Sequence, residues 1–187
     1  MKSQYNSIFR AALVIFLLAG ASLFAQNATA SGTINATLNN RNGIALVFDT
    51  DPAGATLGAT GTSAVTVNFG TISAFGPLSA GITRPVVTAA SFTVRTIFDV
   101  KVTQGGLNST SYRLLANLAA VAPRGLSYAV DAVTLNTNQQ TIQNNATYGS
   151  DIGHKLDLVV STAAPAAGGP AVGTTLTTTI NFTATAN

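Results

Sequence analysis

The sequence contains no cysteine, no tryptophan and no glutamate, and it has one histidine, His154. Without cysteine the chain can hold neither a disulfide framework nor a lipoprotein anchor. A single histidine without cysteine or glutamate leaves a zinc site short of ligands. A Ser-His-Asp hydrolase would have to use His154, but no Gly-x-Ser-x-Gly turn is present. We therefore predict that the protein is not an enzyme and binds no metal or cofactor.

Charge is also scarce, because only 8% of the residues are charged and all six acidic residues are Asp. A chain without Glu and with few Lys lacks the usual residues of helix surfaces, whereas its abundant Thr, Val, Asn and Gly are typical of strands and turns. The basic residues are dispersed and form no cluster, which argues against a nucleic-acid or anionic-membrane surface. The composition predicts an all-β protein with no nucleic-acid partner.

The first residues have the layout of a secretory signal peptide. Lys2 and Arg10 precede an apolar run from Ala11 to Leu18, which small residues follow. We predict a signal peptide over residues 1–25, with cleavage after residue 25 or alternatively after residue 30. The run is shorter than the about 20 residues of a comfortable membrane span, and a retained anchor is the alternative interpretation. Cleavage would leave a secreted or cell-surface protein with no membrane segment, and seven basic against six acidic residues.

The strongest strand signal is the alternation from Thr174 to Ala186. Apolar residues, among them Ile180 and Phe182, occupy one face, and Thr and Asn occupy the other. A shorter alternation from Gly32 to Leu38 places Ile34, Ala36 and Leu38 together. We predict that residues 26–187 form one domain, of which residues 26–39 are an N-terminal extension.

The middle of the chain predicts a hairpin. Between Ser91 and Thr103 an apolar face is formed by Phe92, Val94, Phe98, Val100 and Val102, and after a Gly-rich turn a second alternation begins at Tyr112. The polar tract Asn136 to Gly149 is interpreted as a long loop or an irregular edge, and Lys155 to Val160 as a strand with His154 at its start. Ala163 to Gly173 is a connector to the last strand.

Asp49 and Asp51 could offer oxygen ligands to calcium, but the run Asp-Thr-Asp-Pro has too few ligands for an EF-hand loop. An Asx turn before Pro52 is the better interpretation. About eight short strands with turn signals and no helical period predict a β-sandwich, either immunoglobulin-like (pilin-like) or a jelly roll.

Three stretches, Gly32 to Leu38, Val65 to Gly70 and Leu176 to Ala186, together resemble bacterial fimbrial subunits of the chaperone-usher kind and, more loosely, spore coat U-like secreted proteins. The resemblance implies an incomplete immunoglobulin-like sandwich whose groove is filled by the N-terminal extension of a neighbouring subunit. Ile34, Ala36 and Leu38 would then be donor side chains, and Ile180 and Phe182 would line the acceptor groove. The chain lacks the Cys pair and the penultimate Tyr that are frequent in that family.

The resulting hypothesis is a secreted structural subunit of a bacterial surface fibre, pilus or coat that assembles by strand donation. Its partners would be other copies of itself, joined head to tail, or related subunits. The alternative is a self-contained secreted β-sandwich that binds a protein or a carbohydrate through its loops.

Overall fold

The computed structural model describes residues 28–36, 43–161 and 173–187, which form two β-sheets without a helix. The all-β prediction is confirmed. No helix in this part of the chain could therefore cross a membrane. The predicted signal peptide, Leu38 and nearly all of the predicted connector lie outside the described residues.

The described part of the chain has eleven strands, whereas the sequence predicted about eight. Sheet A has the order β3 (Ala64–Ile72), β1 (Ala28–Ala36), β11 (Thr175–Ala186), β6 (Ser111–Leu118) and β9 (Gln140–Thr147). Sheet B has the order β2 (Ile44–Asp49), β5 (Ser91–Gln104), β10 (Asp151–Ser161), β7 (Leu126–Val130) and β8 (Val133–Thr134), with β4 (Thr83–Val87) also paired to β5. The additional strands include β4, whose mostly exposed residues show no alternation, and β8, which has only two residues.

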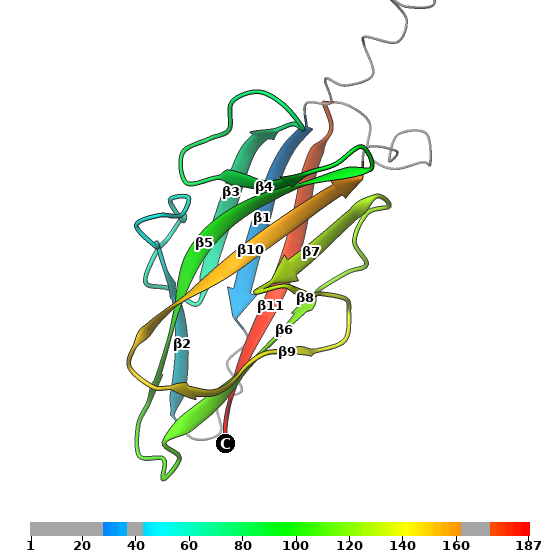
Figure 1. The fold of residues 1–187 in the computed structure, drawn as a ribbon. Helices are drawn as coiled ribbons and strands as arrows, with labels where there is room; N and C mark the ends of the chain where they lie inside the picture. Colours follow the sequence, from blue (N-terminus) through cyan, green and yellow to red (C-terminus); the bar gives the residue numbers. More distant parts are fainter. Residues whose placement is uncertain (1–27, 37–42, 162–172) are drawn as a thin grey trace, which may run out of the picture.

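The two sheets face one another and share one hydrophobic core (Figure 1). The ring of Phe182 on β11 of sheet A lies 5.5 Å from the ring of Phe48 and 5.7 Å from the ring of Phe98, both of which belong to sheet B. These edge-on contacts join the sheets through aromatic side chains that are fully buried. The architecture is therefore a sandwich of two sheets.

The predicted faces of the two central strands are confirmed, but their predicted pairing is wrong. Phe98 on β5 and Tyr112 on β6 are both fully buried. The strands do not form a hairpin, because β5 pairs with β2, β4 and β10 in sheet B while β6 pairs with β9 and β11 in sheet A. The turn after β5 therefore crosses from one sheet to the other.

The structure also tests the predicted strand from Lys155, the polar tract from Asn136 and the predicted turn at Asp51. The predicted strand at Lys155 is part of the longer β10, so that His154 lies inside this strand with 1% of its surface exposed, not at its start. Residues 140–147 of the polar tract form β9 at the edge of sheet A, with two register shifts against β6. The Asp51 carboxylate accepts a hydrogen bond from the Ala53 amide at 2.7 Å, as the predicted Asx turn requires.

Candidate functional site

Strand β1 lies inside sheet A, between β3 and β11 (Figure 1). It pairs parallel with β11, the strand with the strongest sequence signal, and antiparallel with β3. Residues 37–43 join it to β2, which belongs to the other sheet. Without β1, both β3 and β11 would present an unpaired row of backbone N–H and C=O groups. The position that β1 occupies is therefore a groove between two strands, filled by a segment near the N-terminus.

The structure brings two of the predicted donor residues next to the predicted acceptor residues, and it does so within one chain. Ile34 lies opposite Ile180 in the register, and Ala36 lies opposite Phe182. Ile34, Ile180 and Phe182 are all buried. The remaining donor candidate, Leu38, lies outside the described residues.

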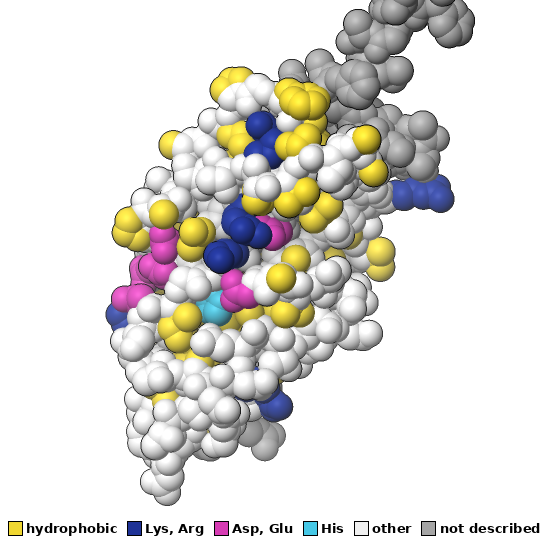
Figure 2. Space-filling view, viewed as in Figure 1, with side chains coloured by type: hydrophobic (Ala, Val, Ile, Leu, Met, Phe, Trp, Pro, Cys, Tyr) yellow, Lys and Arg dark blue, Asp and Glu magenta, His cyan; other side chains and the backbone are white. Residues whose placement is uncertain are grey.

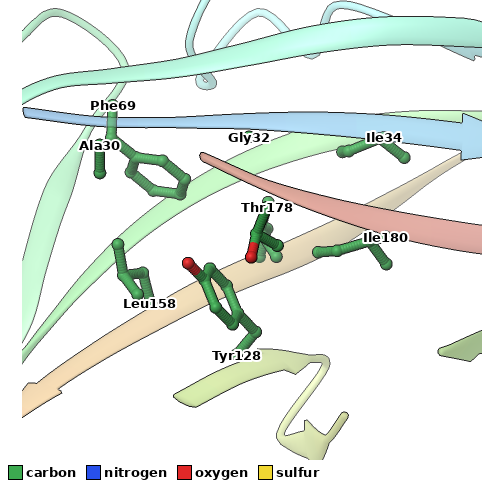
Figure 3. A pocket seen from close by; sticks show the side chains of 9 residues that line it. Ala30, Gly32, Ile34, Phe69, Tyr128, Leu158, Thr178 and Ile180 are labelled. Carbon is green, nitrogen blue, oxygen red and sulfur yellow. The ribbon is translucent and has the colours of Figure 1, made fainter. Parts of the chain in front are cut away.

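The inner face of β1 fills its site incompletely. Its inward positions include Ala30, Gly32 and Ile34, so that one large side chain alone enters the core from this part of the strand. A small cavity of about 10 Å³ lies beside Gly32, between β1, β11, β3 and the inner face of sheet B (Figure 3). A Cβ atom added to Gly32 would meet nothing closer than the carbonyl oxygens of Thr178 and Val67, both at 3.9 Å. The cavity therefore has room for a methyl group.

Two hydroxyl groups face this otherwise apolar cavity. Figure 3 shows Tyr128 rising from β7 of sheet B toward Thr178 of β11. Burial raises the pKa of the Tyr128 hydroxyl, and a hydrogen bond with Thr178 offsets part of that rise. Gly32, Thr178 and Tyr128 were not predicted as site residues from the sequence. A threonine among the inward residues of β11 was the available signal, because a buried hydroxyl needs a hydrogen-bond partner.

The contacts of β1 are mainly those of its backbone. Burying Ile34 is worth about 1.5–3 kcal/mol, whereas Ala30 and Gly32 bury little apolar surface. Eight residue pairs on each side define the register of β1 with β11 and β3. Backbone pairing depends little on which side chains the strand carries. Backbone pairing and the burial of Ile34 thus hold β1 between β3 and β11.

A second polar group lies at the far end of β7. The Nδ1 atom of His154 lies 2.6 Å from Oδ2 of Asp131, and Oδ1 of Asp131 accepts the Lys155 amide at 2.8 Å. Burial raises the pKa of Asp131, but these hydrogen bonds and the nearby positive charge outweigh it and hold the pKa below its usual value. Asp131 and Ala132 have φ angles of 48° and 68°. The pair thus fastens a tight turn between β7 and β8 to β10.

Aspartates gather near the start of β10, but they are not arranged as a metal site. Burial raises the pKa of Asp99, and the negative charges of Asp51, Asp151 and Asp49 raise it further. No group of three or more potential ligands is placed to hold a metal ion among residues 28–36, 43–161 and 173–187. Asp151 also forms an ion pair with Lys101 at 3.3 Å.

Fold and site together define a class: an all-β protein of two facing sheets, one of which is completed by a strand from near the N-terminus. The sequence matches no protein-family model and no curated protein.

Proposed function

We propose that the protein is a secreted structural subunit of a bacterial surface fibre, pilus or coat, and that copies of it assemble by donating β1 to one another. The observation that carries this proposal is the position of β1 between β3 and β11, next to a cavity that its own side chains leave open. The sandwich would be of the immunoglobulin-like kind, in which a donated strand completes a sheet.

Strand exchange is energetically accessible because both states make the same contacts. A β1 from a second copy would present Ile34 to Ile180 as the chain's own β1 does, and exchange of an identical element between copies is a low-cost route to association. Main-chain hydrogen bonds would supply affinity, and Ile34 on the inner face together with the outward side chains would set the register. Donation from each copy to the next does not close on itself and produces a filament.

The linker after β1 is long enough for donation. Residues 37–43 separate β1 from β2, and a stretch of this length spans roughly 25 Å when fully extended. A subunit could therefore keep its body outside the groove of its neighbour while its β1 lies inside. The partners in such a fibre would be further copies of this chain or related subunits.

A pair of engineered cysteines tests the proposal, because the natural chain has none. Thr33 on β1 and Thr179 on β11 are register partners, and neighbouring strands lie about 4.8 Å apart, a distance that a disulfide can bridge. Residues 26–187 carrying Thr33→Cys and Thr179→Cys would be concentrated, oxidised and separated on a denaturing gel without reductant. Donation predicts a ladder of covalent multimers that collapses to monomer when dithiothreitol is added.

The matched control carries Ala45→Cys and Thr103→Cys, which are register partners in β2 and β5 and stay within one chain in either case. It should give monomer throughout. In parallel, deletion of residues 26–39 should abolish polymers seen by electron microscopy, and a fused donor segment should restore them. If the Thr33/Thr179 variant oxidises only to monomer and the intact chain remains monomeric at high concentration, β1 completes its own sheet. Strand donation would then be abandoned for the self-contained binding domain.

A further inference from the structure

Gly32 lies at a position that does not require glycine. Glycine is needed where the backbone has a positive φ angle or where another group comes too close for a side chain. Gly70 on β3 meets both conditions, because its φ angle is 66° and an added Cβ atom would overlap Oγ of Ser79. Gly32 meets neither, since its φ angle is not positive and an added Cβ atom would have its nearest neighbours at 3.9 Å. The chain's own β1 is therefore held less tightly at this position than the groove allows.

The space beside Gly32 suits a small apolar side chain. The cavity of about 10 Å³ is lined by apolar side chains from both sheets, among them Phe69 and Leu158 (Figure 3). The hydroxyl groups of Tyr128 and Thr178, which also face the cavity, form a hydrogen bond with each other, so neither of them lacks a polar partner. A methyl group matches both the size and the polarity of this space, whereas a long aliphatic side chain would overpack it.

A side chain enters the cavity from the strand that lies between β3 and β11. The opposite wall is the inner face of sheet B, to which β10 contributes Leu156 and Leu158. Asp157, between these two residues, forms an ion pair with Arg95 at 2.6 Å on the outer face. Figure 2 shows this outer face of sheet B, identified by the histidine, with acidic and basic side chains gathered over its middle. The wall on this side is a fixed part of the sandwich, so the residue at the position of Gly32 decides how the cavity is filled.

Exchange of β1 between identical copies gains no contacts in the groove. A β1 from another copy makes the same contacts as the chain's own β1, and the chain's own strand is tethered, which gives it an effective concentration on the order of millimolar. A strand from elsewhere has an advantage where it makes a contact that β1 lacks. The cavity beside Gly32 offers such a contact, because a methyl group there adds apolar burial and removes the entropic cost of glycine in a strand.

We propose that the preferred occupant of the groove is a strand of a second, related chain, with alanine at the position of Gly32 and a large aliphatic residue at the position of Ile34. This inference rests on the proposed strand donation and names its partner, which is a related subunit before a further copy of the same chain. The chain's own β1 is then a replaceable filling that keeps β3 and β11 paired until the better-fitting strand displaces it. The alanine makes the binding of this strand about 5- to 30-fold tighter than that of the chain's own sequence.

Competition between two peptides measures this preference directly, because the tethered β1 competes equally with both. Residues 26–187 are unfolded in urea and diluted into buffer that contains two peptides spanning residues 26–39 at equal, millimolar concentration. One peptide has the natural sequence, the other carries Gly32→Ala, and each has its own fluorophore. Circular dichroism establishes that the chain has refolded, and the ratio of the two fluorophores on the chain after size exclusion gives the relative affinity. We expect about 5–30 times more of the Gly32→Ala peptide than of the natural peptide on the chain.

Two leucine peptides show whether the cavity causes the preference. Gly32→Leu places a side chain that is too large for the cavity on the inner face, and this peptide should bind less than the natural one. Thr33→Leu places the same side chain on the outer face of the strand and should bind about as well as the natural peptide. A preference set by hydrophobicity or strand propensity alone would instead favour both leucine peptides over the natural sequence.

Three results would overturn the proposal. The first is a ratio near one for the Gly32→Ala and natural peptides while both are bound, which removes the preference but leaves strand donation intact. The second is a Gly32→Leu peptide that binds as tightly as the Gly32→Ala peptide, which shows that the cavity does not select the side chain. The third is that no peptide binds to the refolded chain, which removes strand donation as well.

Discussion

Filling the cavity beside Gly32 is a direct test of the incomplete fit of β1. In Gly32→Ala the new methyl group would enter open space, with its nearest neighbours at 3.9 Å. Burial of one such group contributes about 0.8 kcal/mol, and replacing Gly by Ala inside a strand removes an entropic cost of about 0.5–1 kcal/mol. We therefore expect the free energy of unfolding to rise by about 1–2 kcal/mol. In a domain of this size the midpoint temperature rises by about 2–4 °C per kcal/mol.

The assay is urea unfolding of the monomeric chain, supported by calorimetry. Gly54→Ala provides the control, because a Cβ atom at Gly54 would lie 1.8 Å from the carbonyl oxygen of Ile97 and must displace backbone. This variant should be destabilised although the chemical change is the same. A Gly32→Ala midpoint at or below that of the wild type would refute the reasoning, because it would mean that the cavity is closed in solution. If β1 exchanges between copies, Gly32→Ala should also slow polymer formation.

Three further predictions concern stability. Phe98→Ala should cost about 3–5 kcal/mol in urea unfolding, because its ring is fully buried between the sheets; an unchanged midpoint would contradict its place in the core. Burial and neighbouring aspartates raise the pKa of Asp99, so its contribution to stability is present below pH 4 and is lost as pH rises. Asp99→Asn should therefore stabilise the chain at pH 7 but not at pH 3, and equal effects at both would be inconsistent with the shift. The pKa of Asp131 is held low by His154, so Asp131→Asn should lower the free energy of unfolding at pH 7. The difference in this free energy between the wild type and the variant should shrink as pH falls through the lowered pKa.

The alternation of apolar residues predicted which side chains enter the core but not which strands are neighbours. Phe98 and Tyr112 are buried as their patterns indicate, yet their strands belong to different sheets. A period of two shows only that one face of a strand is buried, and it does not show which strand lies beside it. A turn of several residues between two such strands can make a hairpin or cross between sheets, and both give the same pattern in the sequence. The pairing is decided by long-range contacts of the whole fold.

At the candidate site, too, the sequence predicted which residues are buried but not how their strands are arranged. The resemblance to fimbrial subunits implied that Ile34 and Ile180 meet as donor and acceptor residues of neighbouring subunits, and the structure places them in register within one chain. Their parallel arrangement and the cavity beside Gly32 follow from how β1 enters between β3 and β11, which the sequence pattern does not determine. Tyr128 was missed because the segment from Leu126 to Leu135 is strand-like in the sequence but does not show which face is buried. The structure shows that the Tyr128 hydroxyl forms a hydrogen bond with Thr178.

Side chains on both faces of β1 affect the register in which it pairs with β11. On the inner face, Ile34 is the one large side chain with a matching position, so packing alone would resist a two-residue slip only weakly. On the outer face, Thr33 lies opposite Thr179 and Asn35 opposite Asn181. A slip by two residues toward the start of β11 would still leave Thr33 opposite a threonine, Thr177, but it would separate Asn35 from Asn181. In the antiparallel pair of β1 with β3, Thr33 also lies opposite Thr66, and such cross-strand pairs contribute about 0.2–1 kcal/mol each. The outward residues of β1 therefore contribute to its register together with Ile34 on the inner face.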